Sequence, residues 1–203
     1  MTPTEAERRF ETIWSELRLL LDWHDGFMFC LVFGDDHRVS ERLRQRIADF
    51  TQTRTRPLRW LKPEQRDTLV ETVLRAVLPQ GEDGRDAELR APLWLQLTVA
   101  PDDPGWDQAR RQVLAALNQR RSELEHTWPR PVFLQLPLAM AADVVVWAPD
   151  LWSIRHYIAL LPTDPAHART EDAIAPERLR TRVLDLDRIG ADELEAGRLD
   201  AAL

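Results

Sequence analysis

Residues 130–161 read RPVFLQLPLAMAADVVVWAPDLWSIRHYIALL, and this stretch decides the fold. It holds two apolar runs, Val132–Leu136 and Tyr157–Leu161, with Pro137 and the segment Ala148–Arg155 between them. Short apolar runs without polar alternation are typical of strands that are covered on both faces of a parallel sheet. We therefore predict two strands that lie next to each other in such a sheet and are joined by a short crossover.

The remaining chain repeats this alternation of apolar runs and amphipathic helices. Apolar residues at helical spacing predict helices over 4–25, 39–50, 63–77 and 106–126. Unbroken apolar runs predict further strands over 27–33, 57–61 and 93–99. Alternation of this kind is typical of an α/β fold. We predict one three-layer domain over residues 1–162, with a mostly parallel sheet of about five strands, helices on both faces and any ligand at the carboxyl edge.

Two segments fall outside this alternation. Residues 163–203 form an acidic C-terminal extension, with short helices predicted from Pro176 and over Ala191–Leu203. The extension either docks on its own domain or on a partner, or is a partly disordered terminus. Residues 80–90 contain two glycines and several charged side chains and are predicted to form a surface loop.

The composition is that of a globular protein with an acidic surface. The 203 residues carry a net charge of −7, and 44% of them are hydrophobic. Nucleic-acid phosphates require a basic face, so this charge argues against a nucleic-acid partner, although a local arginine patch is compatible with it. Lys62 is the only lysine among 27 basic residues, which excludes most lysine-dependent mechanisms. With one cysteine, Cys30, and no apolar run of membrane-spanning length, we expect a cytoplasmic protein without membrane contact.

The turn after the 27–33 run is where a phosphate loop would lie. Such a loop needs glycines that expose backbone N–H groups, a lysine for the β- and γ-phosphates and a hydroxyl for magnesium. Residues 34–40 read GDDHRVS, with one glycine, no lysine and two carboxylates that repel phosphate. The dinucleotide fingerprint G-x-G-x-x-G is absent from the chain as well. We therefore expect no nucleotide cofactor.

Four aspartates follow predicted strands: Asp35, Asp36, Asp102 and Asp103. Carboxylates at such positions usually cap the next helix, and we favour that interpretation. The alternative is that they converge on magnesium and support phosphotransfer or hydrolysis. The serines lack a nucleophile-elbow context and the histidines lack metal-ligand spacing. We expect no catalytic residue and no metal site, and hence a protein that is not an enzyme.

The eight tryptophans include an unusual pair, Trp147 and Trp152, on either side of Pro149-Asp150. One interpretation is that the two rings pack this turn against the sheet edge, with Asp150 as a helix N-cap. The other is that Trp147, Asp150, Trp152 and Arg155 form a contact patch for a partner. We favour packing, because an indole ring brings a large buried area.

Three segments together resemble a known class of domain. They are 26–38, with an apolar run before Asp35-Asp36; 117–137, which contains LNQRR and RPVFLQLP; and 148–155, APDLWSIR, the most specific of the three. Over about residues 10–161 the chain resembles an N-terminal domain of bacterial multidomain proteins of the tetratricopeptide-repeat and STAND-ATPase type, which are often tied to conflict or antiphage signalling. The resemblance implies an AAA- or STAND-like α/β core that has lost its nucleotide site, and it assigns no catalytic residue here.

The expected function is that of a non-catalytic adaptor or regulatory subunit in a bacterial signalling or antiphage-defence system. Repeats normally follow such domains, so we expect this chain to act as a separate subunit with a protein partner encoded nearby, and homo-oligomerisation stays open. One alternative is the magnesium-dependent domain described above. The other is a nucleic-acid sensor that uses the arginine-rich second helix with Arg54, Arg56 and Arg59.

Overall fold

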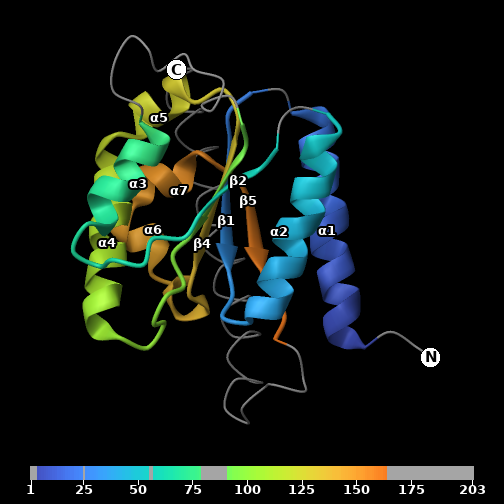
Figure 1. Ribbon diagram of the computed structural model, residues 1–203, viewed down its shortest axis with the longest axis horizontal. Coiled ribbons are helices and arrows are strands. Elements are labelled where there is room, and N and C mark those ends of the chain that lie inside the picture. The colour runs from blue at the N-terminus through green and yellow to red at the C-terminus, as the bar shows by residue number, and fades with distance from the viewer. Residues whose placement is uncertain (1–3, 25, 55–56, 79–90, 164–203) are drawn as a thin grey trace, which may run out of the picture.

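The computed structural model describes residues 4–24, 26–54, 57–78 and 91–163, and these residues form a sheet between two layers of helices (Figure 1). All strand pairs are parallel, and the order across the sheet is β2-β3-β4-β1-β5. The strands are β1 (Met28–Phe33), β2 (Arg59–Leu61), β3 (Leu93–Gln96), β4 (Pro131–Leu136) and β5 (Arg155–Leu160). The predicted α/β class is confirmed. The predicted loop over 80–90 and the predicted helices beyond 175 lie outside the described residues.

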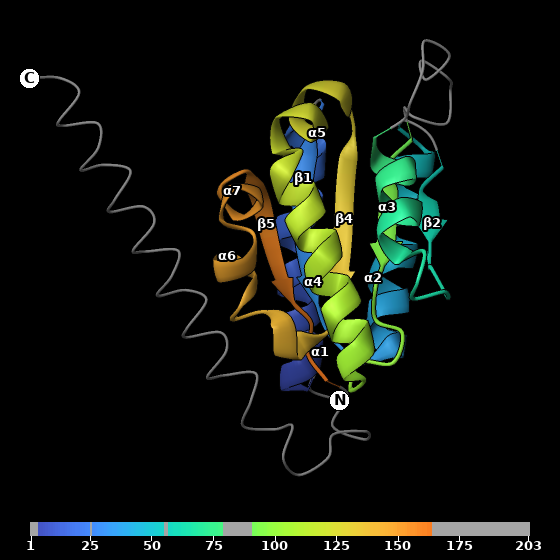
Figure 2. The same cartoon turned by 90° about the vertical axis from the view of Figure 1, so that its left-hand side faces the viewer.

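The helices divide between the two faces of the sheet. One face carries α1 (Glu5–Trp23) and α2 (His37–Gln52). The other face carries α3 (Leu69–Val77), α4 (Pro104–Gln119), α5 (Arg121–Thr127), α6 (Val144–Trp147) and α7 (Pro149–Ser153). Figure 2 shows α3 near β2, α4 over the middle of the sheet, and α6 and α7 near β5. Right-handed crossovers explain this division. The chain crosses the sheet in one direction from β1 to β2 and in the opposite direction from β2 to β5. The helix α2, which joins β1 to β2, therefore lies on one face, and the later connecting helices lie on the other.

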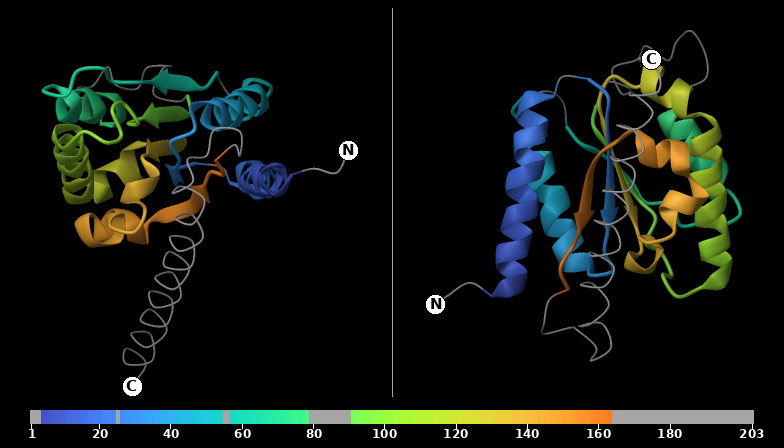
Figure 3. Two further views of the ribbon diagram at one scale, coloured as in Figure 1. Left: turned by 90° about the horizontal axis from the view of Figure 1, so that it is seen from below. Right: turned by 180° about the vertical axis from the view of Figure 1, so that it is seen from behind.

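The helices lie in layers on the two faces of the sheet (Figure 3), and an apolar cluster on each face holds them to it. Alternate residues of β1 point to opposite faces: Phe29, Leu31 and Phe33 pack with α3, α4 and α7, while Cys30 and Val32 pack with α1 and α2. All six residues of β1 and all six of β4 are buried. Burial raises the pKa of the Cys30 thiol far above its usual range, as expected for a small core residue.

The predicted adjacency of the two strands in 130–161 is wrong. β4 and β5 are parallel, but β1 lies between them and pairs with both. β1 is apolar on both faces and needs a neighbour on each side, whereas β5 is only partly buried and carries Arg155 and His156 at its start. The half-polar strand therefore takes the edge of the sheet.

Three predicted element boundaries differ from the structure. The helix predicted from Pro63 begins at Leu69, since the five residues after Pro63 are polar and exposed. The long helix predicted over 106–126 breaks at Arg120 into α4 and α5. β3 ends at Gln96 rather than Val99 because the backbone then turns toward Arg110. Among the described residues, none of the helices combines the length and apolar character needed to cross a bilayer.

Candidate functional site

The place where a parallel sheet of this order would hold a ligand is the carboxyl end of β1 and β4. These neighbouring strands continue to opposite faces: β1 leads to α2, while β4 leads to α6. A crevice opens at such a switch point, and open α/β sheets bind ligands there. The residues at this point are Gly34, Asp35 and Asp36 after β1, and Pro137 and Leu138 after β4.

This switch point is closed by contacts within the protein. The backbone N–H of Leu138 donates to Oδ1 of Asp35 at 3.1 Å, so a carboxylate from the β1 exit bridges to the β4 exit. The N–H of Gly34 donates to the carbonyl of Leu136 at 3.1 Å. A Cβ on Gly34 would lie 2.8 Å from the Cβ of Leu161, so the exit of β5 packs directly against this turn.

Below the turn, the buried side chain of Gln135 joins three elements. Its oxygen accepts from Nε1 of Trp94 on β3 at 3.1 Å, and its nitrogen donates to Oγ of Ser40 on α2 at 2.8 Å. The same nitrogen lies 3.5 Å from the carbonyl oxygen of Gly34. A buried amide must find such partners, and here they tie β4 to the exit of β1 and to the start of α2.

Carboxylates also occupy the N-termini of α2 and α4, two of the helices that begin at this edge. Oδ1 of Asp36 accepts from the N–H groups of Arg38 and Val39 at 2.9 and 3.3 Å. Oδ1 of Asp103 accepts from Gly105 and Trp106 at 2.7 and 3.1 Å. Free N–H groups at a helix N-terminus are what binds phosphate, and here they are bonded to the chain's own side chains.

The buried cation of this region is Arg110 on α4. Its guanidinium donates to the carbonyl oxygens of Leu97 at 2.7 Å and Ala100 at 3.0 Å, to that of Val99, and to Asp107 at 2.5 Å. Ala100 has a φ of 45°, in the left-handed region, so Arg110 stabilises an unusual turn. Burial lowers the pKa of Arg110, while Asp107, Asp35 and Asp103 act in the opposite direction.

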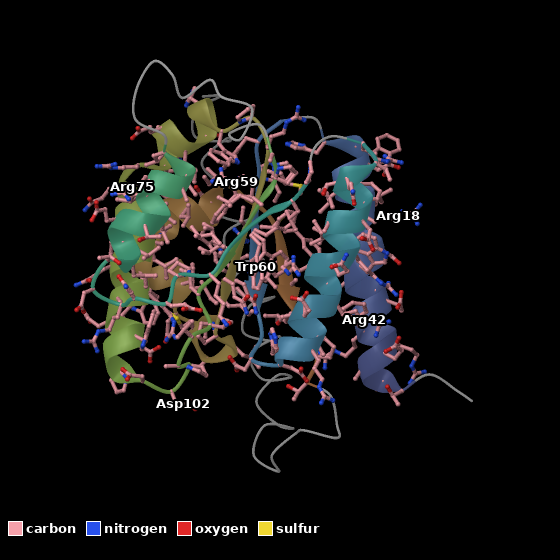
Figure 4. The ribbon with its side chains drawn as sticks, in the orientation of Figure 1. Arg18, Arg42, Arg59, Trp60, Arg75 and Asp102 are labelled. Atoms are coloured by element: carbon pink, nitrogen blue, oxygen red, sulfur yellow. The ribbon has the colours of Figure 1, made fainter. Side chains whose placement is uncertain are left out.

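The four predicted strand-end aspartates therefore have separate roles. Asp36 and Asp103 cap helices, Asp35 bridges to Leu138, and Asp102 is exposed in the loop before α4 (Figure 4). Among the described residues, no group of three or more histidine, cysteine, aspartate or glutamate side chains is placed to hold a metal ion.

The four residues predicted as a contact patch lie on α6, α7 and the start of β5. Trp152 is buried, and the guanidinium of Arg155 lies 4.0 Å from its ring centre and donates to its carbonyl oxygen. Burial lowers the pKa of Arg155 to about 10. Trp152 therefore packs the turn, as the favoured interpretation predicted, and Arg155 packs against its ring.

Asp150 and Trp147 lie closer to the surface. Asp150 is exposed in the first turn of α7, where its carboxylate accepts a hydrogen bond from Nδ2 of Asn118 at 3.1 Å. The predicted capping role of Asp150 is wrong, because the N-cap of α7 is Ala148. Trp147 is half-buried beneath the guanidinium of Arg111, 4.3 Å from its ring centre. Beside it, Val146 is 73% exposed.

Two arginines of α2, Arg42 and Arg46, are engaged by carboxylates of α1. Arg42 donates to both oxygens of Glu7 at 2.8 and 2.7 Å and to Glu11 at 2.9 Å (Figure 4). Arg46 donates to both oxygens of Glu11 at 2.7 and 2.8 Å, and both guanidinium groups lie over the Phe10 ring. Hydrogen bonds from these arginines hold the pKa values of Glu7 and Glu11 below their usual range. This face of α2 attaches α1 to the domain.

The other arginines of the predicted nucleic-acid sensor are dispersed. Arg54, at the end of α2, forms an ion pair with Asp22 of α1. Arg59 lies on the edge strand β2, and Arg56 lies outside the described residues. Exposed ion pairs leave little net positive charge for phosphate contacts.

Sequence reasoning missed several residues that determine this arrangement. Gln135 is the one polar side chain in the β4 run, and Arg110 falls on the inward stripe of α4 beside Ala109 and Val113. Such interruptions are the available signal, because a polar group in an apolar stripe must have internal partners. Asn118 gives no comparable signal. No protein-family model matches the chain, and no curated protein matches its sequence.

Proposed function

We propose that this chain is a non-catalytic adaptor or regulatory subunit of a bacterial signalling or antiphage-defence system, acting in the cytoplasm through protein–protein contacts. The observation that carries the proposal is the closed carboxyl edge of the sheet, where Asp35 bridges the switch point and Asp36 and Asp103 occupy N–H groups of α2 and α4 that a phosphate would use. The assignment to signalling or defence rests on the resemblance of residues 10–161 to STAND-type domains.

The surface that best fits a partner is centred on Val146 and Trp147, with Asp150 beside it. Val146 is exposed and Trp147 is half-buried, so both present apolar area to solvent. Arg111 covers one face of the Trp147 ring, and an arginine on an aromatic ring is a common composition of interface centres. Trp152 and Arg155 support this surface from within.

Calorimetric titration with ATP and magnesium tests the non-catalytic part of the proposal. We expect no binding heat and no phosphate release, because the N-termini of α2 and α4 are capped by aspartates. Saturable binding or hydrolysis by the purified chain would sink the proposal and favour the magnesium-dependent alternative.

A pair of matched variants tests the contact surface. Val146→Glu places a charge on α6, and Leu19→Glu places the same charge on α1, where Leu19 is 59% exposed on the opposite face of the sheet. Affinity capture from the native host should lose its specific partner with the first variant and keep it with the second. Equal capture by both variants contradicts the assignment of this surface.

A further inference from the structure

The pairing of β1 with β5 contains an irregularity at His156. Phe29 pairs with Arg155 and the next residue, Cys30, pairs with Tyr157, so His156 is an extra residue in the register. The N–H of Phe29 donates to Nδ1 of His156 at 3.2 Å. The imidazole thus accepts a backbone hydrogen bond that a carbonyl would accept in a regular ladder.

A second histidine lies against the first. His24 is the C-cap of α1, and its Nε2 donates to the carbonyl oxygen of Phe27 at 2.7 Å. The ring centres of His24 and His156 are 4.7 Å apart, and the Phe27 ring packs edge-on against His156 at 6.1 Å. We call His24, His156, Phe27 and the Phe29 amide the histidine clasp. It joins the end of α1, the entry of β1 and the start of β5.

We propose that the histidine clasp is a pH-sensitive latch, which fastens the start of β5 to the α1–β1 connection at neutral pH and opens when His156 is protonated. The bond from Phe29 requires a neutral ring with its lone pair on Nδ1, since both nitrogens of a charged imidazole are donors. Protonation therefore removes the partner of the Phe29 N–H and places a positive charge beside His24. The proposal is independent of the proposed adaptor function.

The charged groups around the latch act in both directions. His24 comes from α1, and Glu125 of α5 attracts a proton to His156. On β5, the Arg155 guanidinium is stacked on Trp152, and the Tyr157 hydroxyl donates to Glu16 of α1 at 2.7 Å. Burial is the largest cause and His24 the second in lowering the pKa of His156, and both outweigh Glu125 and the backbone of Ile154. The neutral, latched form is accordingly favoured in the folded chain.

Nuclear magnetic resonance on the full chain tests the latch. We expect the Phe29 amide resonance to titrate between pH 7.5 and 5 with the same midpoint as the His156 ring, and that midpoint to lie below about 6.5, the value of an unperturbed histidine. Exchange of the Phe29 amide with solvent, corrected for its intrinsic pH dependence, should accelerate across the same range. A Phe29 amide that does not move with the His156 ring overturns the proposal, as does a His156 midpoint at or above 6.5.

Three variants separate the latch from a general effect of pH. His156→Gln keeps an acceptor but cannot be protonated, so the titration of the Phe29 amide should disappear. His24→Gln removes the neighbouring charge and should raise the midpoint of His156. His37→Gln, at the opposite end of the sheet, should change neither measurement. The proposal is contradicted if the Phe29 amide still titrates in His156→Gln, or if the midpoint of His156 is unchanged in His24→Gln. If a variant does not fold, the titration of the wild-type chain alone tests the proposal.

Discussion

The two ends of the sheet are closed by different chemistry. At the carboxyl end, Asp35 bridges to the Leu138 amide, Gln135 joins β4 to α2, and Arg110 holds the loop after β3. At the amino end, the imidazole of His156 accepts the hydrogen bond that a ladder carbonyl would accept, and burial lowers its pKa. The end where ligands usually bind is thus closed by hydrogen bonds and packing, and the opposite end carries the histidine proposed to respond to pH.

Loss of the Arg110 guanidinium should produce the largest effect at the carboxyl end. Arg110→Met leaves the carbonyl oxygens of Leu97, Val99 and Ala100 without their donor. We expect the free energy of unfolding to fall by about 3 kcal/mol or more, since each buried unpaired group costs about 1–3 kcal/mol. Urea unfolding measures this, with Arg111→Met as the control, which should cost less than about 1 kcal/mol. Equal losses in the two variants would mean that Arg110 does not hold the loop.

A methyl group on Gly34 should be the next most damaging change. Gly34→Ala places a Cβ 2.8 Å from the Cβ of Leu161, and neither backbone can retreat without disturbing the sheet. We expect a loss of about 1–3 kcal/mol, which is typical of overpacking. Gly105→Ala is the matched control, because its nearest contact is the movable guanidinium of Arg66. Thermal unfolding should show the smaller decrease for Gly105→Ala; the reverse order contradicts close packing at the β1 exit.

Substitutions of the aspartates at the carboxyl end should differ in their cost to stability, because the aspartates differ in their hydrogen bonds. Asp36→Ala and Asp103→Ala each remove a helix cap and should each cost about 1 kcal/mol. Asp102→Ala should leave stability unchanged, because Asp102 is exposed. If magnesium instead bound all four aspartates, added magnesium would raise the melting temperature of the wild type, and Asp102→Ala would remove that increase.

The smallest effect is expected at the amino end, as a dependence of stability on pH. The pKa of His156 is lower in the folded chain than after unfolding, so the unfolded state binds more protons as the pH falls below about 6.5. The stability present above that pH is therefore lost progressively as the solution is acidified. His156 is exposed, so solvent screening keeps this dependence small. His156→Gln should flatten this slope in urea unfolding, whereas a slope unchanged by the variant places the titrating group elsewhere.

Local patterns were sufficient to predict the strands and most helices. Apolar runs marked all five strands, and helical spacing marked α1, α2 and the body of α3 and α4. The adjacency of β4 and β5 was predicted wrongly, because the position of β1 between them depends on which strand can tolerate an edge. To predict which strand lies at the edge, one must compare segments that are more than 100 residues apart in the sequence.

The chemistry of the two ends was predicted in part. Capping by Asp36 and Asp103 follows from their place before a helix, and the structure confirms it. The bridge from Asp35 to Leu138 depends on strand order, which periodicity does not encode. The role of His156 depends on a shift in register, and a histidine at the start of a strand carries no sign of it in the sequence.

The closed carboxyl edge of the sheet is tested most directly by its own amides. The N–H resonances of Val39, Gly105 and Leu138 report on the two helix caps and on the Asp35 bridge. Nuclear magnetic resonance titration with magnesium and ATP, and separately with inorganic phosphate, should leave all three resonances in place. Saturable shifts of these amides would show that a phosphate displaces the aspartates, and would contradict the account.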